Sequence, residues 1–188
     1  PYTAYTKTQR FQRDERKPSP IPIEECPWCG EKFNRHSFRL EPSVNRPTDL
    51  RVHCANHHCE FSKDRQLPIV AVDEPIYRRL PCFLIATVDK FAALPWTGET
   101  GALFGKVDRY DANGFYGPCA PGQGKAIPGG QLPPPELIIQ DELHLISGPL
   151  GTVAGLYETV IDALATRMVD GEAIKPKVIA STATVRRA

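Results

Sequence analysis

The chain has 188 residues, of which 41% are hydrophobic and 24% are charged, as expected for one globular domain with or without a small module. Its formal net charge of only +1 argues against a histone-like or tail-type nucleic-acid binder. Because it contains neither an apolar run of the roughly 20 residues that span a bilayer nor a secretory signal, we expect a cytoplasmic protein without membrane contact.

Residues 1–23 are polar and end in the proline-rich run KPSPIPI. They begin at Pro1 rather than at a methionine, and we expect the chain to be a piece of a longer protein. Five cations are spread along the segment: Lys7, Arg10, Arg13, Arg16 and Lys17. This pattern predicts a linker or an extended arm, which is either solvated or in contact with nucleic-acid phosphates.

Residues 24–65 contain four cysteines in two close pairs, which is how metal ligands are spaced in sequence. The pairs are Cys26 with Cys29, and Cys54 with Cys59. Four thiolates complete the tetrahedral coordination of Zn²⁺, and Gly30 allows the backbone to curl after the first pair. We therefore predict a zinc ribbon-like module with Zn²⁺ as its cofactor.

Both the ligand set and the role of this module have alternatives. His57 or His58 could replace Cys59 as the fourth ligand, and His53 is nearby. A closed site with four ligands has no open position for chemistry, which favours a structural role. The other role is a grip on nucleic acid by the arginines Arg35, Arg39, Arg46 and Arg51. Between the cysteine pairs we expect a hairpin with a small core of Phe33, Phe38 and Phe61.

Residues 66–94 return to a globular pattern. Residues 82–86 are apolar and follow Pro81, which predicts a buried strand, and the helix-forming string DKFAAL comes soon after. Residues 95–136 are rich in glycine and proline and show little periodicity. We expect them to form a long loop or insertion.

The pattern becomes regular again after residue 136. Residues 137–139 predict a buried strand, and apolar side chains then recur at steps of three and four from Leu150 to Met168. Such spacing is typical of an amphipathic helix, which Gly171 is placed to end. Residues 177–180 predict another strand, which opens into hydroxyl-bearing residues. Strands alternating with helices favour parallel βαβ units, in which ligands bind at the carboxyl ends of the strands.

Two carboxylates lie at the carboxyl end of the strand predicted at 137–139, after Gln140. In α/β sheets that hydrolyse nucleotides, an Asp at this position, here Asp141, holds Mg²⁺. The next residue, Glu142, can polarise the attacking water as a general base. The four-residue string with His144 is short enough to arise by chance as two solvated carboxylates. Its position between an apolar strand and an amphipathic helix is what favours a nucleotide site.

Three short strings resemble motifs of the superfamily 2 DExH helicases. Residues 141–144 (DELH) resemble motif II, residues 182–184 (TAT) resemble motif III, and residues 86–91 (ATVDKF) resemble motif Ib. The resemblance implies an α/β fold with a partial RecA-like parallel sheet and helices. It also implies that Asp141 binds Mg²⁺ and that Glu142 activates water.

The same resemblance implies roles for five further residues. Hydrogen bonds of His144 with Thr182 and Thr184 would couple the ATP site to the nucleic-acid site. Thr87 and Lys90 would contact the nucleic-acid backbone. Superfamily 2 motors track this backbone, so sequence specificity is not expected.

The longer string DELHLISGPLGTVAGLYE resembles the helicase component of the bacterial DISARM anti-phage system and related large helicases. This implies a fragment of an ATP-dependent helicase or translocase in DNA metabolism or anti-phage defence. DNA is favoured over RNA as its substrate, and protein partners in a defence complex are implied.

The chain also departs from the helicase pattern. It contains no G-x-x-x-x-G-K-[ST] phosphate loop and no second RecA-like lobe. ATP and Mg²⁺ are therefore expected as cofactors of the intact protein, and the chain alone is expected to be inactive. The alternative function is a zinc-ribbon module that binds nucleic acid or protein on a non-hydrolysing α/β scaffold. In either case residues 66–188 form the partial lobe, with an insertion at 95–136.

Overall fold

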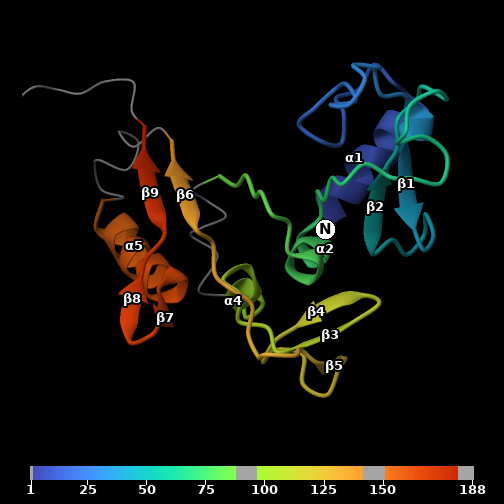
Figure 1. The fold of residues 1–188 in the computed structure, drawn as a ribbon. Coiled ribbons are helices and arrows are strands. Elements are labelled where there is room, and N and C mark those ends of the chain that lie inside the picture. Colours follow the sequence, from blue (N-terminus) through green and yellow to red (C-terminus); the bar gives the residue numbers. More distant parts are fainter. Residues whose placement is uncertain (1, 88–96, 142–150, 182–188) are drawn as a thin grey trace, which may run out of the picture. The chain divides into compact units, whose positions relative to one another are not determined.

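The computed structural model describes residues 2–87, 97–141 and 151–181. They form a mixed α/β structure with short helices and four small sheets (Figure 1). The chain divides into two compact units, Pro1–Pro81 (unit 1) and Cys82–Ala188 (unit 2). Among the described helices, none has the length and apolar character needed to cross a membrane.

Unit 1 begins with the helix α1, Tyr2–Arg13, where a linker or extended arm was expected. Tyr5, Thr8 and Phe11 recur every three residues, so they share one helix face, and all three are buried. The Thr8 hydroxyl donates to the Ala4 carbonyl at 2.9 Å, which satisfies it inside the helix. The cations lie between these positions and give the segment a polar composition, so the apolar face is not evident from the sequence.

A hairpin forms the centre of unit 1. The strands β1, Phe38–Glu41, and β2, Asp49–Val52, pair antiparallel with Phe38 opposite Val52 and Leu40 opposite Leu50. These four side chains alternate with exposed ones and point into the core. The Phe38 ring meets those of Phe11 and Phe33 edge-on, at centroid distances of 5.4 and 5.5 Å. The predicted hairpin and its phenylalanine core are therefore confirmed, with Phe61 packed at the margin.

Unit 1 ends with the helix α2, Asp73–Arg79. Acidic residues occupy its first turn and basic residues its last, which suits the helix dipole. Asp49, at the start of β2, forms ion pairs with Arg79 of α2 and, at 3.7 Å, with Arg51. Leu80 ends the helix in a left-handed conformation with φ of 49°.

In unit 2, the segment expected to be a loop contains regular structure. After the short helix α4, Thr100–Leu103, come the strands β3, Arg109–Asp111, β4, Gly114–Tyr116, and β5, Lys125–Ala126. They form an antiparallel sheet in the order β4-β3-β5. The buried apolar residues of this segment follow neither helical nor strand periodicity. They are Phe104, Val107, Tyr116 and Ala120. The glycine content reflects tight packing, since several of these glycines lie against backbone atoms.

The two strands predicted nearer the C-terminus are confirmed. β6, Leu137–Gln140, and β9, Lys177–Ala180, pair in parallel, and α5, Gly151–Ala165, lies between them in sequence. This is a strand–helix–strand order with a parallel pair (Figure 1). Within the described ranges, no further strand joins it to make the wider RecA-like sheet.

The predicted end of the helix at Gly171 is wrong. Helix α5 ends at Ala165, and a hairpin of β7, Arg167–Val169, and β8, Glu172–Ile174, follows. Asp170 and Gly171 form its turn with φ of 51° and 87°. An Asp-Gly pair with positive φ at both residues is typical of a two-residue hairpin turn.

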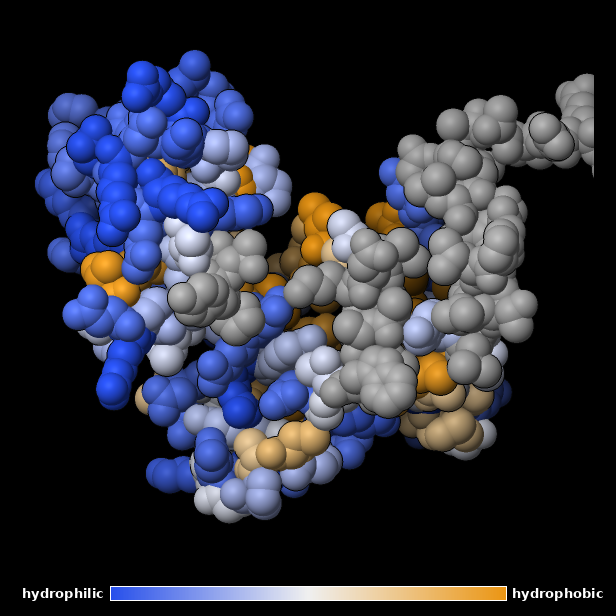
Figure 2. All heavy atoms as spheres, turned by 180° about the vertical axis from the view of Figure 1, so that it is seen from behind, coloured by the Kyte–Doolittle hydropathy of each residue, from blue (hydrophilic) through white to orange (hydrophobic). Residues whose placement is uncertain are grey.

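The strand predicted at 82–86 is also absent. The structure assigns these residues no strand, and Phe83 and Ile85 are exposed by 72% and 83%. Apolar side chains of β6 and β9 are exposed as well, among them Ile139 and Val178. Figure 2 shows hydrophobic side chains at the surface of unit 2, whereas unit 1 presents a mainly hydrophilic surface on this face. The helix predicted at DKFAAL lies outside the described residues.

Candidate functional site

The first cysteine pair lies on a tight backbone turn. The Gly30 N–H donates to the Cys26 carbonyl, and the Cys26 N–H donates to Glu31, both at 2.8 Å. Gly30 has φ of 75°, a conformation that side chains disfavour. The turn brings Cys26 and Cys29 to the same side.

The second pair is held by a different set of hydrogen bonds. The Cys54 N–H donates to Phe61 at 2.8 Å, and the Cys59 N–H donates to Asn56 at 3.0 Å. The Asn56 N–H points at the Cys54 sulfur at 3.4 Å. Backbone donors of this kind stabilise a thiolate.

The four cysteines come together in one cluster, defined by Cys26, Cys29, Cys54 and Cys59. Their sulfur atoms all lie within 4.8 Å of one another. The sulfurs of Cys29 and Cys54 are 3.4 Å apart, too far for a disulfide bond. Zn–S bonds of about 2.3 Å in a tetrahedron place sulfurs roughly 3.8 Å apart. The cluster therefore fits a tetrahedral metal site, and it could hold a zinc ion.

The histidines are not part of this cluster. His57 and His58 are exposed, and the group among the described residues that could hold a metal consists of cysteines alone. His53 is buried, and burial lowers its pKa, as do Arg39 and Arg51. The structure thus favours Cys59 as the fourth ligand.

The electrostatics of the thiols differ with their surroundings. Burial raises the pKa of the Cys54 thiol, whereas the backbone N–H of Glu31 lowers the pKa of the exposed Cys29. A divalent cation at the centre would favour the deprotonated form of each.

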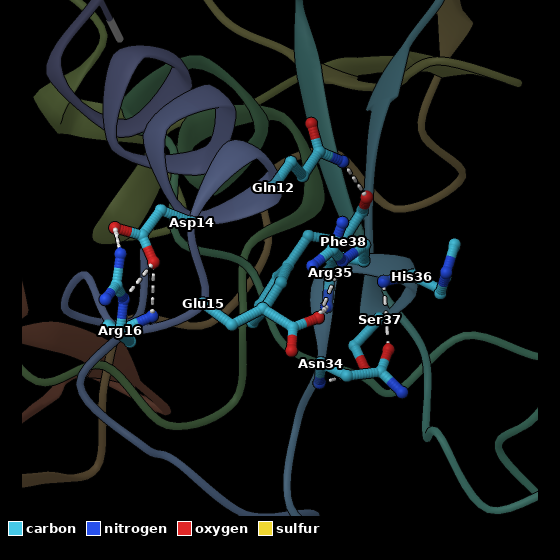
Figure 3. Close-up of polar contacts among 9 residues, drawn as sticks. All are labelled: Gln12, Asp14, Glu15, Arg16, Asn34, Arg35, His36, Ser37 and Phe38. Atoms are coloured by element: carbon cyan, nitrogen blue, oxygen red, sulfur yellow. Dashed lines mark hydrogen bonds and ion pairs between the residues drawn. The ribbon is translucent and has the colours of Figure 1, made fainter.

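Helix α1 is anchored to the cysteine module, residues 24–65, by polar contacts (Figure 3). The Gln12 amide donates to the Phe38 carbonyl at 2.7 Å. Glu15, just after the helix, accepts from the backbone N–H of Arg35 at 2.8 Å and from its guanidinium at 3.0 Å. Sequence reasoning missed this anchor, because the two partners are twenty residues apart and no local pattern links them.

The arginines proposed to grip nucleic acid have mixed surroundings. Arg35 is engaged with Glu15, whereas Arg39 and Arg51 face each other across β1 and β2 on the exposed side. Like charges in this position repel, and Arg51 is partly neutralised by Asp49. The nucleic-acid role of these side chains stays a prediction.

The carboxyl ends of β6 and β9 form the second candidate site. The two strands end side by side, since Gln140 pairs with Ala180 and the Ser181 N–H donates to the Gln140 carbonyl at 2.8 Å. Asp141 follows β6 directly and is exposed. Parallel pairing thus places the carboxyl ends of β6 and β9, which precede DELH and TAT in the sequence, at one edge of the pair.

The remaining predicted residues are not all described. Thr87 is exposed in an irregular segment. Five residues lie outside the described ranges, namely Lys90, Glu142, His144, Thr182 and Thr184. Their roles therefore stay predictions.

Comparison with known proteins relates the chain to the DISARM system, in agreement with the resemblance found in its sequence. The relative is the DISARM protein DrmA of Bacillus paralicheniformis, which is 48% identical over 175 residues and 88% of this chain. The chain spans 16% of the length of that protein. No family model matches the chain.

Proposed function

We propose that the chain is part of the motor of an ATP-dependent nucleic-acid helicase or translocase that acts in anti-phage defence. The arrangement of β6 and β9 carries this proposal. Their parallel pairing puts Asp141 and Ser181 at adjacent strand ends, and open parallel sheets bind ligands at this edge. The likeness to DISARM protein DrmA supports the defence context.

The chemistry assigned to this edge is ATP hydrolysis in the intact protein. Asp141 would hold Mg²⁺, which would neutralise charge on the phosphates of ATP. Glu142 would orient and deprotonate the attacking water. Both carboxylates follow β6 in sequence, and in this proposal both act on one ligand. The phosphate loop that this chemistry also requires would come from another part of the longer polypeptide.

Coupling to nucleic acid is assigned to hydroxyl, imidazole and amine groups. His144 would exchange hydrogen bonds with Thr182 and Thr184 as the nucleotide state changes. Thr87 and Lys90 would contact phosphates of the tracked strand, which is DNA rather than RNA in this proposal. Exposure of Thr87 is consistent with such a contact.

The cysteine cluster is assigned a structural Zn²⁺. Three of its four cysteines are buried and belong to the same core cluster as the buried side chains of the hairpin and α1. A metal there contributes directly to folding. Zinc binding would keep this unit folded while the motor changes state.

The test is ATPase activity of the full-length parent protein, with and without DNA. We expect DNA to stimulate hydrolysis, and Glu142→Gln to abolish it while ATP binding survives. Glu158→Gln, an exposed carboxylate of α5, is the matched control and should leave the rate unchanged. A parent protein that neither binds nor hydrolyses ATP would overturn the motor, and the zinc module would then be the part to test for binding of nucleic acid or protein.

A further inference from the structure

A row of three side chains, two of them exposed and one half-buried, crosses the small sheet of unit 2. Tyr110 of β3 pairs with Phe115 of β4 on one side and with Lys125 of β5 on the other. Partners across neighbouring strands project from the same face of a sheet. Phe115, Tyr110 and Lys125 therefore form a continuous row, which we call the stacking row.

Tyr110 and Lys125 are exposed on this face and Phe115 is half-buried beside Tyr110, whereas Tyr116 on the opposite face is buried. Tyr110 is 43% exposed, whereas Tyr116, one residue beyond Phe115 and on the other face, is 5% exposed. The Tyr116 hydroxyl donates to Asp111 at 3.0 Å, which ties the buried face to the end of β3. An aromatic side chain held outward in this way leaves a ring surface open to a ligand.

The geometry of the row is set by the backbone. The Tyr110 and Phe115 rings have their centroids 6.4 Å apart and are tilted by 38°. Gly124 has φ of 72°, and a Cβ there would lie 2.8 Å from the Tyr110 carbonyl oxygen. The strand carrying Lys125 thus approaches β3 at a distance that only glycine permits. The two rings already lie beside each other without a ligand, so the main side chain that binding must order is that of Lys125.

The charge beside the rings points to a polyanion. Lys125 is exposed and forms no ion pair with any residue that the structure describes. The nearby acids are engaged: Asp108 pairs with Arg109 at 3.1 Å, and Asp111 accepts hydrogen bonds from Tyr116 and Asn113. Aromatic rings for bases and a neighbouring cation for phosphate are the two parts of a site for single strands.

We propose that the stacking row binds single-stranded nucleic acid, with a base stacked on Tyr110 and a phosphate held by Lys125. Bases in a duplex are stacked on each other and present no free face, so the row selects single strands. The proposal deepens the proposed function, since it names the form of the nucleic acid that the motor would engage. Binding at the row does not itself require ATP, so the two can be tested separately.

The experiment measures binding of a fluorescein-labelled oligothymidine to the full-length parent protein by fluorescence anisotropy. Tyr110→Leu keeps the apolar bulk but removes the ring, and we expect about tenfold weaker binding, within the range for loss of one base–aromatic stack. Tyr110→Phe keeps the ring and should bind within about twofold of wild type. Duplex DNA should bind equally to all three proteins. Unchanged single-strand binding in Tyr110→Leu, or an equal loss for duplex, would overturn the proposal.

Salt dependence tests the cation separately. Lys125→Gln should reduce the slope of log affinity against log salt by about 0.7, the value for one phosphate contact on a single strand. Lys177→Gln, an exposed lysine at the start of β9, is the control and should leave the slope unchanged. Equal slopes for wild type and Lys125→Gln would remove Lys125 from the site.

The ATPase of the same variants separates the two proposals. If the parent binds the oligonucleotide through Tyr110 yet neither binds nor hydrolyses ATP, the motor assignment fails and the stacking row stands. If ATP hydrolysis is stimulated by DNA while Tyr110→Leu binds single strands like wild type, the stacking row fails and the motor stands. Hydrolysis without nucleic acid should be the same in Tyr110→Leu and wild type, which also verifies that the variant is folded.

Discussion

Replacing Cys29 by serine tests the metal site without disturbing the core. Cys29 is the exposed member of the cluster, so Cys29→Ser removes almost no packing. Its effect must therefore come from the metal. Structural zinc contributes about 10–16 kcal/mol in small domains, so one of four thiolates accounts for about 2.5–4 kcal/mol if they share it equally. That loss corresponds to a decrease in zinc affinity of about 70- to 900-fold.

The assay combines zinc content, measured by mass spectrometry, with competition against a chromophoric chelator. We expect Cys29→Ser in the full-length parent to carry one equivalent of zinc less than wild type after exposure to the chelator. Cys82→Ser, an exposed thiol outside the cluster, is the matched control and should keep the wild-type content. Exposed His57 and His58 should also be dispensable when changed to alanine.

Two outcomes would refute this reasoning. Wild-type zinc affinity in Cys29→Ser would show that the cluster is not a four-thiolate site. Loss of zinc in His57→Ala or His58→Ala would restore a histidine as the fourth ligand. All three residues are exposed, so we expect the variants to fold like wild type. Circular dichroism that matches wild type verifies this and ties a change in zinc content to the ligand itself.

Three further predictions concern stability. Phe38→Ala, which empties the centre of the unit 1 core, should lower the free energy of unfolding by about 3–5 kcal/mol in urea titrations. Glu15→Gln should lower the melting temperature at neutral pH. Hydrogen bonds from the Arg35 backbone and side chain lower the pKa of Glu15. This stabilisation is therefore present above the ordinary carboxyl pKa and disappears as the pH falls through the lowered pKa of the folded protein. Gly124→Ala should speed proteolysis within residues 97–136 more than Gly122→Ala, because both have positive φ but only Gly124 lies against a backbone carbonyl.

Each of these has an outcome that contradicts it. A loss below about 1 kcal/mol for Phe38→Ala would mean that the core is not packed as described. A melting difference for Glu15→Gln that persists at acidic pH would exclude the ionised carboxylate as its source. Equal proteolysis of Gly122→Ala and Gly124→Ala would show that β3 and β5 do not approach as closely as the structure has them.

The features that sequence reasoning predicted correctly are those with strong local patterns. The strands at 137–140 and 177–180 are short apolar runs rich in β-branched residues, and such runs are predicted by composition alone. The spacing of the cysteine pairs predicted that they come together, and their four sulfurs do form one cluster that could hold a metal. The hairpin of the module was predicted from the length of the segment between the two cysteine pairs, and that segment does contain the paired strands β1 and β2.

The errors have physical reasons. In α1, three buried positions are spaced as on a helix, but one of them is Thr8, which looks polar in sequence and is satisfied by its own backbone. Asp170-Gly171 is a two-residue hairpin turn in the structure, and a glycine after an apolar helical pattern resembles a helix end, which is why the sequence predicts one there. Residues 82–86 have strand composition, yet a strand needs a hydrogen-bonding partner, which no described segment provides. The cross-strand row at Tyr110 depends on register, which sequence spacing does not reveal.

The open pair of β6 and β9 has a practical consequence for handling the protein. Two parallel strands with exposed apolar faces, such as those of Ile139 and Val178, offer backbone donors and acceptors to any extended chain that meets them. A fragment ending near residue 188 should therefore precipitate at concentrations where one ending near residue 81 stays in solution. Unit 1, with its closed core and a cysteine cluster that could hold zinc, is the piece to produce in isolation, and it must include α1, because trimming to the cysteines would uncover Phe38.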